Sequence, residues 1–243
     1  MEVFKFKHFE IQHDNCSQKV GTDGVLIGAW TQPSITPQTI LDVGAGTGLI
    51  SLICAQRFES AQIDAVELSD DCYEQAASNF ENSIWNDRLF CYHASFQEFY
   101  EEVEDPYDLI ISNPPFFKDD SISDVNEINL ARRSARFDAD LPFEHLLLGV
   151  SQLLSPTGTF AAIIPFDRKA EFLEIAAALD LLPVRLTLVK GTVESKVKRV
   201  MLELRFRESV TPTQTNTLII ENSRHRYTEA YKNLCSPFYL YLQ

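Results

Sequence analysis

The sequence has few basic residues and no long apolar run, and each shortage excludes a class of protein. Lysine and arginine total 21 of the 243 residues against 35 aspartates and glutamates, a formal net charge of -14. A protein that coats nucleic acid with its whole surface needs a positive field, so this class is excluded, whereas a local basic patch is not. No stretch approaches the roughly 18 apolar residues of a membrane span, and the N-terminus lacks an apolar signal core. We therefore expect a cytoplasmic protein that does not engage membranes.

Cysteine is scarce as well. The five cysteines are Cys16, Cys54, Cys72, Cys91 and Cys235. They form no C-x-x-C pair, and no histidine lies nearby at ligand spacing, so neither a metal site nor a disulfide framework is indicated. We expect reduced thiols that fill core space.

The hydrophobic pattern is that of an α/β protein. From Gln38 onward, short apolar runs alternate with longer helical stretches, which is typical of a parallel sheet with helices on both faces. The expected strands are 39–43, 63–67, 89–93, 107–112 and 159–164, and the expected helices are 49–58, 70–80 and one that starts after Pro142. Two further runs, 182–190 and 199–206, are joined by 191–196 and predict an antiparallel hairpin at one edge of the sheet.

These elements predict one domain, because 243 residues with 45% hydrophobic content bury one large core and are too few for two. Residues 1–37 form an N-terminal lead-in, and residues 38–243 form the domain, with a C-terminal tail, 208–243, packed on it. We expect a monomer.

A glycine-rich loop follows the first expected strand. Asp42 precedes Gly44, Gly46 and Gly48 in a G-x-G-x-G pattern, where glycines let backbone amides approach a ligand. A dinucleotide site has G-x-G-x-x-G and holds a pyrophosphate, which a carboxylate at Asp42 would repel. The acid instead suits the cationic amino acid end of S-adenosylmethionine, and Glu67, at the end of the next strand, is placed to accept hydrogen bonds from ribose hydroxyls.

A second motif, Asn113-Pro114-Pro115-Phe116, follows the strand 107–112. The Asn113 oxygen and the Pro114 carbonyl can accept the two hydrogens of an exocyclic amine, which frees its lone pair for attack on a methyl group. The prolines fix the backbone so that these acceptors are preorganised, and Phe116 offers a stacking face. The pair of motifs predicts transfer of a methyl group to a planar nitrogen.

Together these motifs resemble those of class I methyltransferases, and most closely the bacterial valine-tRNA adenine-N6 methyltransferase family. The likeness also covers the block Lys19 to Trp30, Ala131-Arg132-Arg133 and the tail Tyr227 to Leu240. The resemblance implies a seven-stranded, mostly parallel Rossmann-like sheet and N6-methylation of the adenosine at nucleotide 37, beside the anticodon of a valine tRNA. It implies that the cofactor is also contacted by Thr22, Asp23, Leu68, Ser95, Phe96 and Asn113. Ser95 and Phe96 stand where such enzymes often use an acid to hold the adenine.

Basic residues are concentrated in two places. Between Arg185 and Arg207 there are seven basic residues and two acidic ones, in a chain that is acidic overall. This asymmetry favours a local surface that faces the anticodon loop of a tRNA. The candidate RNA-binding residues are Arg132, Arg133, Arg136, Lys190, Lys196, Lys198 and Arg199. A solvated strand face with alternating charge is the alternative interpretation.

Three other functions remain open. An Asn-Pro-Pro corner can hold the side-chain amide of a protein glutamine, although such enzymes usually carry tyrosine at the position of Phe116 and a separate N-terminal domain. A guanine-N2 methyltransferase of ribosomal RNA shares the motif but is commonly built from duplicated halves. The third is a non-catalytic RNA-binding module.

Overall fold

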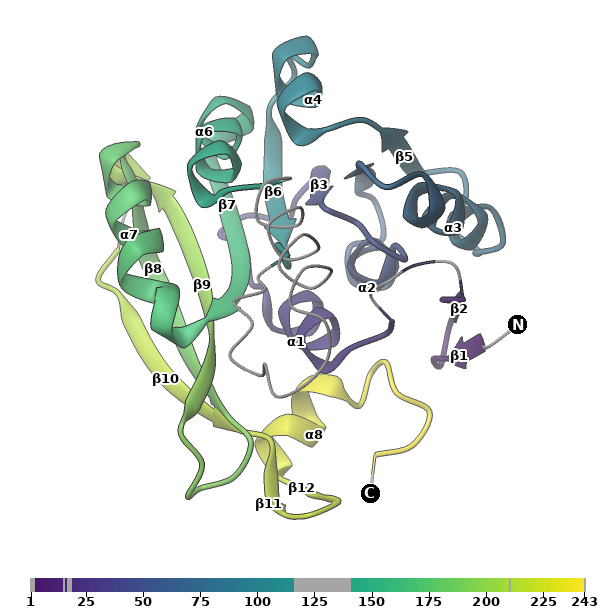
Figure 1. The fold of residues 1–243 in the computed structure, drawn as a ribbon, viewed down its shortest axis with the longest axis vertical. Helices are drawn as coiled ribbons and strands as arrows, with labels where there is room; N and C mark the ends of the chain where they lie inside the picture. Colours follow the sequence, from purple (N-terminus) through teal and green to yellow (C-terminus); the bar gives the residue numbers. More distant parts are fainter. Residues whose placement is uncertain (1–2, 15, 17–18, 116–140, 210, 243) are drawn as a thin grey trace, which may run out of the picture.

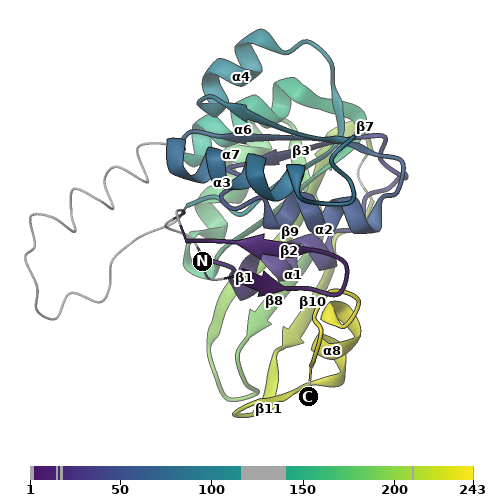
Figure 2. The same ribbon diagram turned by 90° about the vertical axis from the view of Figure 1, so that its right-hand side faces the viewer.

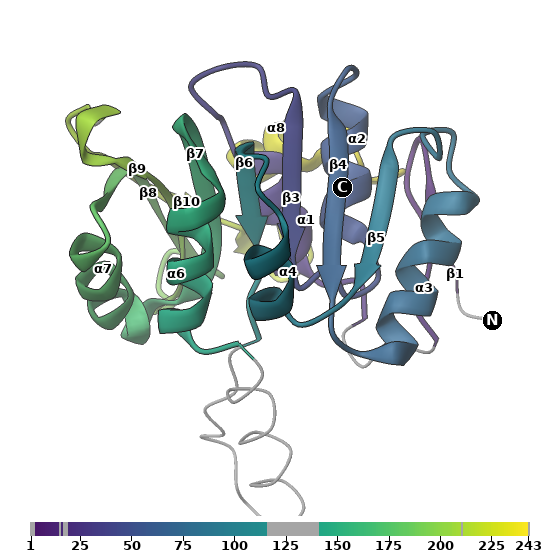
Figure 3. The same cartoon turned by 90° about the horizontal axis from the view of Figure 1, so that it is seen from above.

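A central twisted sheet organises the part of the chain that the structure, a computed structural model, describes: residues 3–14, 16, 19–115, 141–209 and 211–242. Its eight strands follow the order β10-β8-β9-β7-β6-β3-β4-β5. Helices cover both faces of this sheet (Figures 1 and 3). The α/β architecture expected from the alternating pattern is confirmed.

Five neighbouring strands run parallel in this sheet. They are β3 (Thr39–Val43), β4 (Gln62–Glu67), β5 (Leu89–His93), β6 (Tyr107–Ser112) and β7 (Leu154–Pro165). β3 pairs with β4 on one side and with β6 on the other, so the chain builds outward in opposite directions from this point. Such a reversal leaves a crevice at the carboxyl ends of the strands, where open α/β sheets bind ligands.

The other end of the sheet contains the antiparallel pairs. The whole sheet has eight strands, one more than the seven expected. β8 (Leu181–Lys190) and β9 (Val197–Phe206) form the predicted hairpin, and β9 pairs with β7. β10 (Gln214–Ile219) pairs parallel to β8, so β10 and not the hairpin forms the edge. Most side chains of β10 are exposed, and its polar sequence therefore carries no apolar alternation from which the strand could be predicted.

Two layers of helices enclose two hydrophobic clusters. One cluster lies under α1 (Thr22–Trp30), α2 (Leu49–Arg57), α3 (Asp70–Glu81) and α8 (Glu229–Cys235). The other lies under α4 (Phe96–Glu102), α6 (Phe143–Leu153) and α7 (Lys169–Ala178). Successive residues of β3 serve opposite layers, because Ile40 belongs to the first cluster and Leu41 to the second. None of the helices in the described residues has the length and apolarity needed to cross a membrane.

The N-terminal and C-terminal segments lie against each other and against the first layer. The hairpin of β1 (Val3–Lys5) and β2 (Glu10–Gln12) is joined to the tail by a bridge between Phe6 and Tyr239. The small pair of β11 (Glu221–Ser223) and β12 (Arg226–Tyr227) precedes α8, at the end of the molecule where the β8–β9 hairpin turns (Figures 1 and 2). Two backbone hydrogen bonds, from Ile220 to Lys190 and from Glu221 to Gly191, connect them to that turn.

Candidate active site

The glycine loop between β3 and α2 has the backbone that its sequence requires. Gly44, Gly46 and Gly48 have φ angles of 74°, 56° and 78°, a region that residues with a Cβ rarely adopt. At Gly48 space adds a second constraint, because a Cβ there would lie 2.4 Å from the Phe80 ring. The loop is held to the sheet by hydrogen bonds from the Gly44 and Ala45 amides to the Val66 carbonyl, at 3.0 and 3.2 Å.

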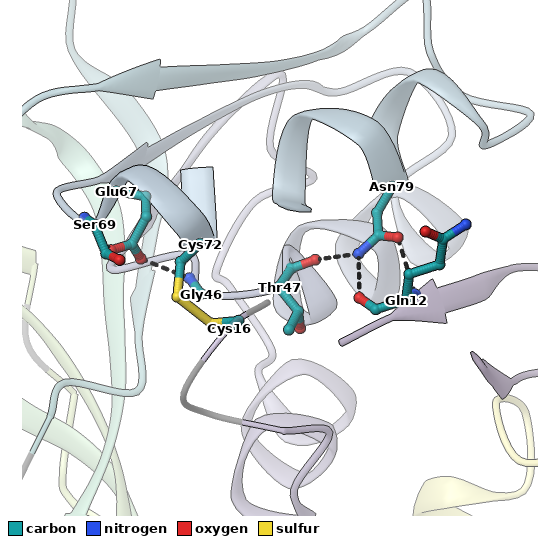
Figure 4. The surroundings of a disulfide bond; sticks show 8 residues. All are labelled: Gln12, Cys16, Gly46, Thr47, Glu67, Ser69, Cys72 and Asn79. Atoms are coloured by element: carbon teal, nitrogen blue, oxygen red, sulfur yellow. Dashed lines mark hydrogen bonds between the residues drawn. A yellow bond between two sulfur atoms is a disulfide. The ribbon is translucent and has the colours of Figure 1, made fainter. Parts of the chain in front are cut away.

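Glu67, at the end of β4, lies beside this loop. One of its carboxylate oxygens accepts from the Gly46 amide at 2.8 Å, and the other accepts from the Ser69 amide at 2.9 Å (Figure 4). Each oxygen has a second lone pair, so the carboxylate retains acceptor capacity. The structure thus brings the two sequence motifs of the cofactor hypothesis together. Leu68, which follows, has 44% of its surface exposed.

Asn79 of α3 connects the loop to β2. Its side-chain amide donates to the Thr47 carbonyl at 2.9 Å and to the Gln12 carbonyl at 3.0 Å, and its oxygen accepts from the Gln12 amide at 3.0 Å (Figure 4). Asn79 is buried. Because one side chain joins three segments, the position of the loop depends on the N-terminal hairpin, a connection that no sequence motif indicates.

Asp42 lies beneath the loop and does not line the cavity described below. It is fully buried, and one of its oxygens accepts from the amide and the hydroxyl of Ser51 in α2, at 3.0 and 2.6 Å. Burial raises the pKa of Asp42 to about 7, and the nearby charge of Glu67 adds to this effect. The expectation that Asp42 faces the cationic end of a cofactor is therefore not supported by its position. Its observed contacts tie the first strand to the helix after the loop.

The carboxyl end of β5 also differs from the expectation. Ser95 is the N-cap of α4 and forms a capping box with Glu98, and Phe96 is buried in the second cluster, against Tyr100. The helix turns the Phe96 side chain into the core, a position that gives no support to the expected contact with a ligand ring. His93 and Tyr73 stack at this edge with ring centroids 4.9 Å apart.

A cavity of about 850 Å³ opens at the carboxyl edge of the sheet. Its first wall consists of the glycine loop and the start of α1, and its second wall comes from the end of β7 and the start of β9. The residues predicted as site residues that line it are Thr22, Asp23, Gly44, Gly46, Asn113, Lys198 and Arg199. The Gly21 to Gly24 block, which resembles a turn in the sequence, is the N-terminal turn of α1 in the structure. Gly48, Glu67 and Leu68 lie outside the cavity lining.

Asn113 lies between the two walls. The strand that precedes it is fixed at its end, because the Ser112 hydroxyl donates to the Val43 carbonyl at 2.8 Å. The side-chain oxygen of Asn113 is buried and has no hydrogen-bond partner among the residues that the structure describes. A buried acceptor without a partner costs about 1–3 kcal/mol, so a native structure that retains one needs an explanation. A ligand hydrogen in the cavity supplies such an explanation. Pro114 is buried and Pro115 half-buried, whereas Phe116 and the candidate RNA-binding residues Arg132, Arg133 and Arg136 lie outside the described residues.

The basic residues of the hairpin divide into two groups. Arg185 pairs with Glu203 at 2.7 Å and stacks on Trp30, Arg207 pairs with Asp180 at 2.9 Å, and Arg199 pairs with Asp23 at 2.8 Å. These pairs compensate much of the positive charge that the sequence suggested. Lys196 and Lys198 are exposed, and Lys190 donates to the Val193 carbonyl within the turn.

One covalent bond near the loop was not predicted. Cys16 and Cys72, expected as reduced thiols, form a disulfide with their Cα atoms 4.7 Å apart (Figure 4). Cys54, Cys91 and Cys235 are free. The bond joins the segment before α1 to the start of α3, and the Cys16 sulfur lies near Gly46. Fifty-six residues separate the two cysteines, so their proximity arises only in the folded chain.

Comparisons with known proteins agree with this geometry. The family model described as the methyltransferase small domain matches residues 21–137. A tRNA1(Val) (adenine(37)-N6)-methyltransferase from Christiangramia forsetii is 48% identical over 243 residues, which cover 99% of each chain. Its counterpart from Trichodesmium erythraeum is 41% identical over 239 residues, 98% of this chain and 97% of the relative. Among solved structures, a predicted O-methyltransferase from Agrobacterium tumefaciens superposes with a TM-score of 0.70 at 18% identity, over 91% of this chain and 99% of that chain, which establishes the fold alone.

The relatives align with this chain from end to end, and the glycine loop, Glu67 and Asn113, by which the sequence resembled their family, lie at one edge of the sheet. The chain therefore belongs to the family of the tRNA1(Val) (adenine(37)-N6)-methyltransferases.

Proposed function

We propose that this protein transfers the methyl group of S-adenosylmethionine to the N6 nitrogen of an adenosine in tRNA, namely adenosine 37 of a valine tRNA. The observation that carries the proposal is the unpartnered, buried oxygen of Asn113 in the cavity that the glycine loop also lines. The substrate assignment is supported by relatives of 40–48% identity that bear this activity in their names.

The chain's own contribution to the chemistry is to make a weak nucleophile reactive. The exocyclic amine of adenine shares its lone pair with the ring, so it attacks poorly while it stays planar. The Asn113 oxygen accepts one hydrogen of this amine, and the Pro114 carbonyl is proposed to accept the other. These acceptors favour a pyramidal nitrogen, whose lone pair then points along the line of attack. Because the prolines restrict the backbone, little reorganisation is needed during the reaction.

The residues of the first wall fit the cofactor. S-adenosylmethionine carries its methyl group on a positively charged sulfur, and its other half is a neutral nucleoside. A site for it requires a backbone that can approach closely and acceptors for its hydroxyl hydrogens. The glycine loop permits that approach, and Glu67, which lies beside the loop but outside the cavity lining, retains lone pairs for hydroxyl donors. Thr22 and Asp23, at the start of α1 in the same wall, are proposed to contact the methionine end.

We assign the RNA-docking role to the lysines of the β8–β9 hairpin, Lys190, Lys196 and Lys198, and keep Arg132, Arg133 and Arg136 as sequence-based candidates. Arg199 borders the same cavity and is joined to Asp23. Lys190 ends β8, Lys196 lies in the turn, and Lys198, near the start of β9, lines the cavity, so an RNA loop bound along them could reach Asn113. A protein that acts on tRNA in this way is expected to be cytoplasmic, and we keep the prediction of a monomer.

The test is methyl transfer from labelled S-adenosylmethionine to unmodified total tRNA, followed by nucleoside analysis. We expect N6-methyladenosine, located at nucleotide 37 of a valine tRNA. Asn113→Ala should lower turnover about 100- to 1000-fold, which is the usual effect of removing one preorganised polar group, and leave the affinity for the cofactor unchanged. Asn216→Ala, at an exposed position of β10, is the matched control and should retain full activity.

Other outcomes would replace the proposal. If tRNA receives no label, label on guanine N2 of ribosomal RNA would identify ribosomal RNA as the substrate. Label on a glutamine side chain in a protein extract would identify a protein as the substrate. If the protein binds the cofactor and tRNA but transfers no methyl group, it is a non-catalytic RNA-binding module.

A further inference from the structure

The cavity has two walls, and the second differs chemically from the first. At about 850 Å³ it lies near the upper end of the range for small-molecule sites, about 300–1000 Å³. The first wall is glycine-rich and contributes backbone atoms. The second wall, beyond Asn113, contains an aromatic ring, Phe166, an aliphatic side chain, Val197, and the cationic residues Arg168, Lys198 and Arg199.

We propose that Phe166 is a stacking platform for the target adenine, in addition to the stacking face expected of Phe116, and that the second wall is the subsite of the acceptor nucleotide. This inference rests on the proposed function and names the part of the site that receives the base. A flipped base needs a flat apolar surface for its face and cations for the flanking phosphates, and the second wall combines both.

The sheet brings Asn113 and Phe166 to the same edge, where both line the cavity. β6 and β7 run parallel with Ser112 opposite Ala162, so both strands end at the same edge. Asn113 follows the first strand, and Phe166 follows the second directly after Pro165, which is paired with Arg199. Both residues therefore face one cavity from neighbouring strands, Phe166 about three residues further along its strand than Asn113.

Phe166 is also held in place. It begins the 3-10 turn Phe166–Arg168, and the preceding Pro165 restricts the backbone at a φ of -57°. Its ring is half-buried against the second hydrophobic cluster, with the Lys169 ammonium 5.3 Å from its centre. A partly supported aromatic ring at a cavity wall is preorganised, so that stacking a base on it costs little side-chain entropy.

The cations of this wall are positioned by their neighbours. Arg168 lies over the Phe143 ring at 4.0 Å and pairs with Glu171 at 2.8 Å, and Arg199 is bonded to Asp23. Lys198, between Val197 and Arg199, is exposed. An ammonium group at this rim suits a phosphate of the nucleotide whose base enters the cavity, since phosphate contacts position RNA while the base is recognised inside.

The experiment compares Phe166→Leu, Phe166→Tyr and wild type, with an anticodon stem-loop of valine tRNA as substrate and calorimetry for S-adenosylmethionine. Leucine keeps an apolar side chain but removes the aromatic face, whereas tyrosine retains it. We expect Phe166→Leu to lower kcat/KM for the RNA about 10- to 100-fold, in line with the loss of one stacked base. Phe166→Tyr should stay within about threefold of wild type, and all three should bind the cofactor equally. Phe90→Leu, at a 42% exposed position of β5, is the matched control and should behave as wild type.

Each other result would overturn the inference. Equal kcat/KM for Phe166→Leu and wild type would show that the ring does not contact the base. Equal losses in the leucine and tyrosine variants would assign a packing role, and a weaker cofactor affinity in Phe166→Leu would assign Phe166 to the cofactor half. None of these would affect the proposed function, which is tested by methylation of tRNA by the wild-type protein.

Discussion

At the scale of single residues, Asp42 shows how the fold changes the chemistry of a motif residue. Its carboxyl group is fully buried, and only one of its two oxygens has a hydrogen-bond partner, on Ser51. Desolvation disfavours the charged form, so the pKa rises from 3.8 to about 7. At pH values below 3.8 both the folded and the unfolded state are protonated and the group has no effect on stability. As the pH rises, the unfolded chain ionises first, so the free energy of unfolding falls until the pH reaches about 7.

Asp42→Asn is expected to remove this pH dependence. The asparagine oxygen can accept the same hydrogen bonds from Ser51 and carries no charge at any pH. Each pKa unit corresponds to about 1.4 kcal/mol, so the variant should gain about 2–3 kcal/mol of unfolding free energy relative to wild type between pH 5 and pH 7. Urea unfolding of both proteins at several pH values measures this difference. Parallel curves for the two proteins would mean that the Asp42 carboxyl group titrates alike in the folded and unfolded states.

At the scale of elements, the β8–β9 hairpin shows how tertiary contacts redistribute charge. The sequence shows an excess of basic residues there, but Arg185 and Arg207 form ion pairs with Glu203 and Asp180. The Arg185 and Glu203 side chains are 17% and 2% exposed, so this pair supports the packing of the sheet edge and is not available to RNA. The exposed cations near the turn are chiefly lysines.

We therefore predict that Lys196→Glu combined with Lys198→Glu weakens tRNA binding and reduces its salt dependence. Two lost phosphate contacts should lower the slope of log affinity against log salt by about 1–2, because fewer counterions are released. Filter binding at several salt concentrations measures both quantities. Lys5→Glu with Lys7→Glu changes the net charge equally on exposed residues of the N-terminal segment and should leave the slope unchanged. If the hairpin variant and this control have the same slope, the lysines do not contact RNA phosphates.

At the scale of the whole molecule, the Cys16–Cys72 disulfide connects the segment before α1 to α3, next to the glycine loop. A cross-link that closes a loop of this length, with 56 residues of sequence separation, restricts the unfolded chain by an amount equivalent to about 4 kcal/mol. Asn79 links the same helix to the loop and to β2, so the N-terminal segment and the cofactor side of the cavity are joined twice.

Cys16→Ser should accordingly lower the unfolding free energy by about 2–4 kcal/mol under oxidising conditions, as judged by urea unfolding. A dithiol reductant should destabilise the wild type by a similar amount and have no effect on the variant. Cys16→Ser with Cys72→Ser should lose no more than the single variant, since both remove one bond. Cys91→Ser, which removes a thiol that the structure leaves free, should retain the response to reductant. An identical stability of wild type with and without reductant would contradict the prediction.

The sequence by itself determined what depends on local pattern. Apolar periodicity predicted the strands β3 to β6 and the helices α2 and α3 to within a residue or two, and the glycine and Asn-Pro-Pro motifs predicted a site at the carboxyl edge, because parallel strands end together. Periodicity did not reveal β10, whose side chains are mostly exposed, and the turn-like Gly21-Thr22-Asp23-Gly24 concealed the start of α1.

Tertiary structure decided everything that requires residues distant in sequence to meet. It buried Asp42 and Phe96, paired Arg199 of the hairpin with Asp23 of α1, and brought Phe166 and Asn113 into the lining of one cavity. It also brought Cys16 and Cys72 together. Local patterns determine the conformation of a segment, whereas burial, ion pairing and bond formation depend on which segments the packed core brings into contact.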